Sequence, residues 1–143
     1  PALVDMAAAL GIAVDQRDIV PDDRKTIAET LRRWADKEML HLILTTGGTG
    51  LAPRDVTPEA IMDVPERPAT GFGEAMRNRS MADTPRGFLT RSIAATRGTT
   101  LIVSFPGSER AVRQCFEAIS PALRHGIETL NGWDAECGAW LRC

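Results

Sequence analysis

The chain has 143 residues, of which 43% are hydrophobic and 25% charged, and its formal net charge is -2. This length suits one domain with one core, and the small net charge argues against a nucleic-acid partner. No apolar run approaches the ~20 residues of a membrane-spanning helix, which argues against a membrane protein. The three cysteines, Cys115, Cys137 and Cys143, lack metal-ligand spacing, so we expect free thiols in a reducing, cytoplasmic compartment.

The N-terminal residues predict two helices on either side of an extended segment. Ala2 to Leu10 has apolar residues at helical spacing and stops at Gly11, a residue suited to a helix C-terminus. Ile12 to Val20 alternates loosely and is rich in β-branched residues, so we expect a strand there. Pro21-Asp22-Asp23 predicts a turn and a helix cap, and Arg24 to Asp36 has the pattern of an amphipathic helix.

The rest of the chain alternates strands with helices. Leu40 to Leu44 is an almost wholly apolar strand that leads into TTGGTGLAPRDVTPEA, residues 45–60. Within that run, Thr57 is expected to cap a short helix, with Pro58 at its first position. The sequence further predicts a helix over 73–81, a strand over 99–105 and a long helix over 109–130. Pro121 lies inside that last helix and predicts a kink or a break near Ser120.

This alternation predicts an α/β fold, a three-layer sandwich with a mainly parallel central sheet flanked by helices. Ligands of such sheets bind at the carboxyl ends of the strands. Three loops are expected at that edge: Pro21 to Asp23, Thr45 to Asp55 and Pro106 to Ser108. We therefore expect the site among these loops.

The glycine-rich loop after the second predicted strand is the strongest local signal. Gly47, Gly48 and Gly50 lack Cβ atoms, so phosphate oxygens could approach their backbone. The lysine of a P-loop is missing. The residues alone leave two interpretations open, a phosphate-binding loop and a tight turn without a ligand.

The acidic residues near this loop are also open to two interpretations. Asp55 lies between Pro53 and Pro58, where it could bind Mg²⁺, form an Asx-turn, or cap the helix that starts near Thr57. For Asp22 and Asp23 the spacing favours capping. Glu74, Arg91 and Ser92, taken alone, read as surface residues.

Several motifs together resemble the molybdenum-cofactor biosynthesis proteins, the family that includes molybdopterin adenylyltransferases and a domain of gephyrin. The matching segments are IVPDD, TTGGTGLAPRDVTPEA, GFGEAMR and LTRSIAATRGTTLIVSFPGS. The resemblance covers residues 1–132 as one molybdopterin-binding domain and leaves 133–143 as an unmatched tail. Members of the family begin with an apolar strand and a Ser-Asp loop. Both lie outside this sequence, so we expect the first strand to be missing from the sheet.

The resemblance implies a function. Such proteins transfer AMP from Mg-ATP to molybdopterin and release pyrophosphate, so Mg²⁺, ATP and molybdopterin are the expected cofactor and substrates. The family also implies a homotrimer and contact with a molybdate-insertion protein. Two alternatives are a molybdopterin-binding module without catalysis, and a related competence or nicotinamide-salvage domain of the same fold.

The resemblance further assigns roles to individual residues. Asp55 and Asp22 match the family's catalytic acids, and Asp55 would also handle Mg²⁺. The expected molybdopterin- and phosphate-binding residues are Thr46, Gly47, Gly48, Thr49, Gly50, Glu74, Ser92, Pro106, Gly107 and Ser108.

Overall fold

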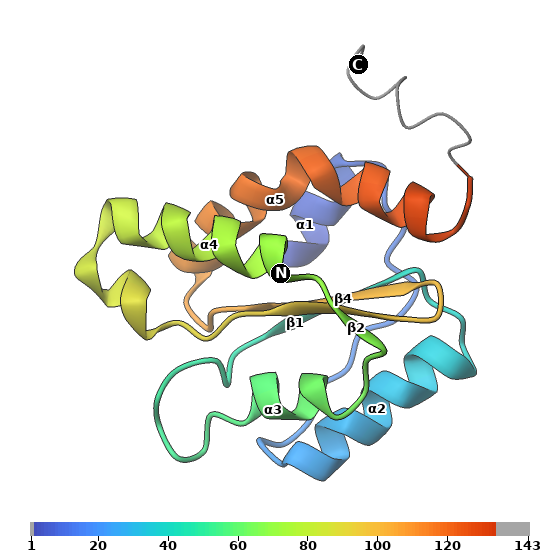
Figure 1. Ribbon diagram of the computed structural model, residues 1–143, viewed down its shortest axis with the longest axis horizontal. Coiled ribbons are helices and arrows are strands. Elements are labelled where there is room, and N and C mark those ends of the chain that lie inside the picture. The colour runs from blue at the N-terminus through green and yellow to red at the C-terminus, as the bar shows by residue number, and fades with distance from the viewer. Residues whose placement is uncertain (1, 134–143) are drawn as a thin grey trace.

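A four-stranded sheet separates two layers of helices in the computed structural model, which describes residues 2–133 (Figure 1). One face carries α1 (Ala2–Ala9), α4 (Thr70–Asp83) and α5 (Glu109–Leu130), and the other carries α2 (Arg24–Asp36) and α3 (Thr57–Met62). The remaining elements are β1 (Leu42–Thr46), β2 (Arg67–Pro68), β3 (Ala94–Arg97), β4 (Thr100–Phe105) and the 3₁₀ helix η1 (Pro85–Leu89). None of these described helices is long and apolar enough to cross a membrane.

The strand order is β1-β4-β3-β2. β1 pairs in parallel with β4, whereas β3 runs antiparallel to both β4 and β2. Three strands therefore share one direction, as the predicted mainly parallel sheet requires, and β3 is the exception. The reversal of chain direction between β3 and β4 takes place in a two-residue turn, in which Gly98 has φ +53°. Because β3 is reversed, the residues before it lie at the edge where β1 and β4 end.

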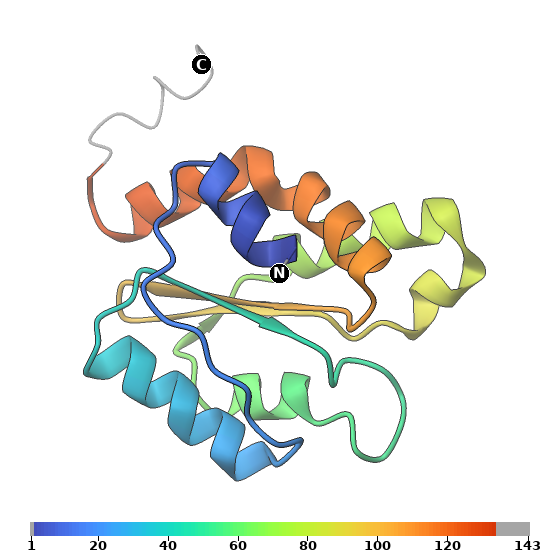
Figure 2. The same ribbon diagram turned by 180° about the vertical axis from the view of Figure 1, so that it is seen from behind.

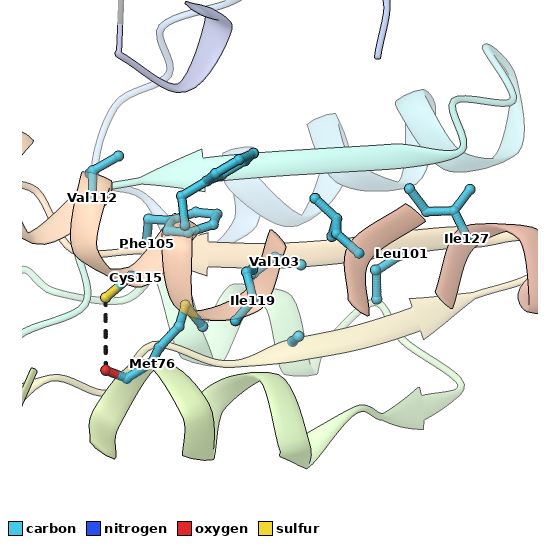
Figure 3. Packing of buried hydrophobic residues seen from close by; sticks show 11 residues of the cluster. Met76, Leu101, Val103, Phe105, Val112, Cys115, Ile119 and Ile127 are labelled. Atoms are coloured by element: carbon cyan, nitrogen blue, oxygen red, sulfur yellow. Dashed lines mark hydrogen bonds between the residues drawn. The ribbon is translucent and has the colours of Figure 1, made fainter. Parts of the chain in front are cut away.

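Two apolar clusters fill the space between the sheet and its helices. Leu101, Val103 and Phe105 of β4 pack toward α4 and α5 (Figure 3), whereas Ile102 packs toward α2 and α3. β4 is buried on both faces, and such a strand needs a nearly continuous apolar sequence. This is why the sequence predicts a strand over residues 99–105. Cys115 is a buried free thiol with a raised pKa caused by burial. Cys137 and Cys143 lie outside the described residues.

The predicted strand over residues 12–20 is wrong. This segment is an irregular connection that crosses from α1 on one face to α2 on the other (Figure 2). Ile19 is 90% exposed, and no backbone hydrogen bond joins the segment to a strand within residues 2–133. Alternation alone does not form a strand when no neighbouring strand pairs with the segment.

Two expected helix features also differ. Thr57 does not cap α3 but is its first helical residue, and the capping position belongs to Val56, which makes no side-chain cap bond. α5 runs unbroken through Pro121, so of the kink or break expected there the break is wrong and the kink stays a prediction. Buried Ile119 and Leu123 on either side of Pro121 hold the helix on the core, which offsets a proline cost of about 3 kcal/mol.

β1 lies at one edge of the sheet. Among residues 2–133 its only strand neighbour is β4, so its outer backbone groups have no strand partner there. The expectation that the family's first strand is missing from the sheet stays a prediction.

Candidate functional site

Two strand-end loops meet at the carboxyl edge of the sheet. Because β1 and β4 are parallel neighbours, the residues that follow them lie side by side. Gly47 N–H donates to the carbonyl of Phe105 (3.1 Å), and Thr46 Oγ1 donates to the carbonyl of Pro106 (2.8 Å). A Cβ on Gly107 would lie 3.6 Å from Gly47 Cα. The structure thus brings the predicted loops 46–50 and 106–108 together.

The glycine loop turns in a conformation that other residues rarely adopt. Gly47 and Gly48 have φ values of +94° and +64°. A Cβ on Gly48 would lie only 2.3 Å from Oγ1 of Thr57, the first residue of α3. Glycine at position 48 therefore lets the loop lie directly against α3.

Three successive carbonyls of this loop, those of residues 48–50, accept hydrogen bonds. The carbonyl of Gly48 accepts from Thr57 N–H (3.1 Å), and that of Thr49 accepts from Arg91 N–H (2.8 Å). The Gly50 carbonyl accepts from Arg91 Nε (2.8 Å). The amides of the same three peptide planes are those of residues 49–51, and none has a protein partner within residues 2–133.

A trans peptide points its N–H away from its C=O, and no cis peptide is present among the described residues. Each of the three amides therefore points away from the donor that holds the carbonyl of its own peptide plane. Successive unpaired amides of this kind attract the oxygens of phosphate or carboxylate groups. The loop is consequently a candidate anion-binding site.

Asp55 closes the far end of this loop. Its Oδ2 accepts from Ala52 N–H (3.0 Å), while its own N–H donates to the Ala52 carbonyl (2.8 Å). A Cβ on Gly50 would lie 2.7 Å from Asp55 Oδ2, so the carboxylate covers that glycine. The Asx-turn or helix cap expected of Asp55 is therefore wrong, because its carboxylate bonds backward to Ala52 and α3 has no side-chain cap. Its Oδ1 has no hydrogen bond within the described residues.

Arg91 is a site residue that the sequence interpretation missed. Besides its two bonds to the loop carbonyls, its Nη2 donates to the Asp55 carbonyl (2.5 Å). Its Nη1 forms a salt bridge with Glu59 of α3, and this hydrogen bond lowers the pKa of the Glu59 carboxyl. The partners of its side chain lie 32 to 41 residues away, so no local pattern marks it.

A shallow cavity of about 380 Å³ adjoins this salt bridge. Its lining combines three arginines, one carboxylate and apolar groups: Arg24, Arg77, Arg91, Glu59, Thr90, Pro58, Met62 and Ile93. Arg91 thus contacts the glycine loop and also lines this cavity.

The acids before α2 do not join the loop by any described contact. Asp23 caps α2 by accepting from Thr26 N–H (2.8 Å) and Thr26 Oγ1 (2.6 Å), and these bonds lower its pKa. This capping was predicted. The capping also expected of Asp22 is wrong, because Asp22 is exposed and makes no hydrogen bond within the described residues.

Three other predicted residues have distinct surroundings. Ser108 caps α5 by accepting from Ala111 N–H (3.3 Å). Ser92 is 1% exposed, and its hydroxyl lies 3.0 Å from that of Thr90. Glu74 is exposed on α4 and lines a second cavity, of about 300 Å³, beside Arg77. Only Ser108 therefore belongs to the two loops described above.

For metal binding, residues 2–133 contain no cluster of three or more His, Cys, Asp or Glu side chains. Asp55 offers one free carboxylate oxygen. This fits Mg²⁺, which often takes one or two carboxylates and completes its octahedron with phosphate oxygens and water.

Comparison with known proteins gives one consistent family. Residues 1–125 match the family described as "Probable molybdopterin binding domain". The chain is 39% identical over 115 residues to the molybdopterin adenylyltransferase of Helicobacter pylori J99, covering 80% of this chain and 65% of that protein. With the Escherichia coli K12 molybdopterin adenylyltransferase it shares 39% identity over 113 residues, covering 76% and 58%. The chain thus spans less than two thirds of these relatives.

Among solved structures, the molybdopterin biosynthesis enzyme MoaB from Thermus thermophilus superposes with a TM-score of 0.86. The two are 43% identical, and the match covers 92% of this chain and 82% of that one.

Proposed function

The chain belongs to the molybdopterin-binding domain family, and we propose that it acts as a molybdopterin adenylyltransferase. The observation that carries the proposal is the row of unpaired amides at residues 49–51, whose peptide carbonyls are bonded to Thr57 and Arg91. Molybdopterin and ATP both carry phosphate groups, and successive backbone N–H donors suit the binding of phosphate oxygens. Two relatives that are 39% identical to the chain are named molybdopterin adenylyltransferases.

In the proposed reaction, an oxygen of the terminal phosphate of molybdopterin attacks the α-phosphorus of ATP. A new P–O bond forms, the bond from the α-phosphorus to the oxygen shared with the β-phosphate breaks, and pyrophosphate leaves. Such a transfer depends on positioning and charge neutralisation more than on covalent chemistry by the protein. The amides of the glycine loop would hold a phosphate, with Thr46, Pro106, Gly107 and Ser108 beside it.

We assign the metal-side role to Asp55, whose Oδ1 makes no hydrogen bond within the described residues. Mg²⁺, when bound with ATP, would supply charge neutralisation at the phosphates. Asp22 is proposed as a supporting acid on the strength of the resemblance. Ser92 and Glu74 are proposed to act from outside the loop, Ser92 through Thr90 and Glu74 from the second cavity.

The assembly is proposed from the family resemblance. We propose a homotrimer in the cytoplasm that contacts a molybdate-insertion protein. Within each chain, residues 1–132 would form the binding domain and residues 133–143 a separate tail. The outer edge of β1, which no strand within residues 2–133 pairs with, is open to pairing with a further strand.

One observation favours the alternative of a binding module without catalysis. Asp55 Oδ2 is already engaged by Ala52 N–H, which is a structural use of the proposed catalytic acid.

The test is product formation. The chain is incubated with molybdopterin and Mg-ATP, and adenylylated molybdopterin is measured by chromatography, with heat-denatured protein as the control. We expect product and pyrophosphate in equal amounts. Molybdopterin binding without product would support the binding module, and absence of any pterin binding would favour a different member of the fold.

A further inference from the structure

The guanidinium of Arg91 connects three parts of the site. Its Nε donates to Gly50 O (2.8 Å) and its Nη2 to Asp55 O (2.5 Å), so it joins the two ends of the 50–55 loop. Its Nη1 pairs with Glu59, which fixes the guanidinium to α3. All three nitrogens of this guanidinium thus donate to protein acceptors.

These bonds have a consequence for the amides. The Gly50 carbonyl shares a trans peptide plane with the Leu51 amide, and the Thr49 carbonyl shares one with the Gly50 amide. Arg91 bonds both carbonyls, the first through Nε and the second through its own N–H. Two of the three unpaired amides are therefore oriented by one residue.

We propose that Arg91 is a positioning residue that pre-orders the amide row for a phosphate group without touching the phosphate itself. The inference rests on the proposed function in that the ligand carries phosphate. Ordering the loop in advance lowers the entropy lost on binding, which raises affinity. Arginine suits this role because its planar fork donates in several fixed directions, whereas lysine offers a single ammonium group.

The chain offers a matched control in Arg97. It also pairs with a carboxylate, Asp36 (2.8 and 2.7 Å), and donates to a backbone carbonyl, that of Val64 (2.6 Å). Arg97 is the last residue of β3, whereas Arg91 lies just before Ala94, the first residue of that strand. The two arginines therefore have similar structural duties at opposite ends of one strand.

The experiment compares Arg91→Lys with Arg97→Lys. Inorganic pyrophosphate is the probe, its Kd is measured by calorimetry below the unfolding transition of both variants, and their Tm values are recorded. We expect both Tm values to fall, but only Arg91→Lys to weaken pyrophosphate binding, by about tenfold. A purely structural role would lower the Tm of Arg91→Lys and leave its Kd unchanged.

Two results would overturn the inference. If Arg91→Lys binds pyrophosphate as the wild type does, positive charge alone suffices and the fixed geometry is irrelevant. If the wild-type chain binds no pyrophosphate, the loop is not a phosphate site, and the proposed function loses its main support as well. The first result leaves the proposed function standing, so the two failures are distinguishable.

Discussion

Replacing Gly48 by alanine is expected to abolish phosphate binding by the glycine loop. The residue has φ +64°, and an added Cβ would lie 2.3 Å from Thr57 Oγ1. Thr57 is buried, and its Cβ would lie 3.3 Å from the added Cβ, so rotating its hydroxyl away does not remove the close contact. The loop must leave α3, which disorders the amide row. We expect the affinity for pyrophosphate to fall by about a hundredfold or more, since several charge-assisted bonds are lost.

Gly98→Ala is the control for this change. Gly98 also has a positive φ, +53°, but an added Cβ meets nothing within 4 Å, and the residue lies in the β3–β4 turn. The backbone cost of about 1–2 kcal/mol is common to both variants, so stability should fall in each. Calorimetric titration with pyrophosphate should show binding by Gly98→Ala and none by Gly48→Ala. Equal binding by both variants would contradict the role given to the loop.

Replacing Asp55 is expected to stop adenylyl transfer while molybdopterin still binds. Asp55→Ala removes both the charge and the bond from Ala52 N–H, so loss of activity in that variant has two explanations. Asp55→Asn separates them, because its amide oxygen can still accept from Ala52 N–H. We expect both variants to lose turnover by about a thousandfold, the scale of removing one electrostatic element from a transition state.

The measurements for Asp55 are the rate of adenylylated product and the Kd for molybdopterin. Loss of turnover in Asp55→Asn with an unchanged Kd is the expected pattern. If Asp55→Asn turns over at the wild-type rate while Asp55→Ala does not, the residue serves only to close the turn. If both remain active, the assignment of this acid is wrong.

The sequence predicts the parts of the site whose causes are local. A short apolar strand followed by glycines, and a second apolar strand followed by Pro106-Gly107-Ser108, define the two loops without knowledge of their partners. The rule that parallel strands end at one edge then predicts that the loops meet. The capping role of Asp23 is local in the same sense.

The sequence does not predict interactions between distant residues. Arg91 reads as a solvated charge because Gly50, Asp55 and Glu59 are remote in sequence. Residues 12–20 read as a strand because alternation says nothing about whether a neighbouring strand is present to pair. β3 was missed although Gly98, between AATR and TTLIVSF, is a local hairpin signal.

The most direct test of the amide row is a ¹H–¹⁵N correlation spectrum of the wild-type chain titrated with inorganic pyrophosphate. The geometry predicts that the amide signals of Thr49, Gly50 and Leu51 shift together and saturate with one Kd, while that of Gly98 stays in place. Saturable binding that leaves these three amides unchanged would contradict the central claim that the glycine loop holds the phosphate.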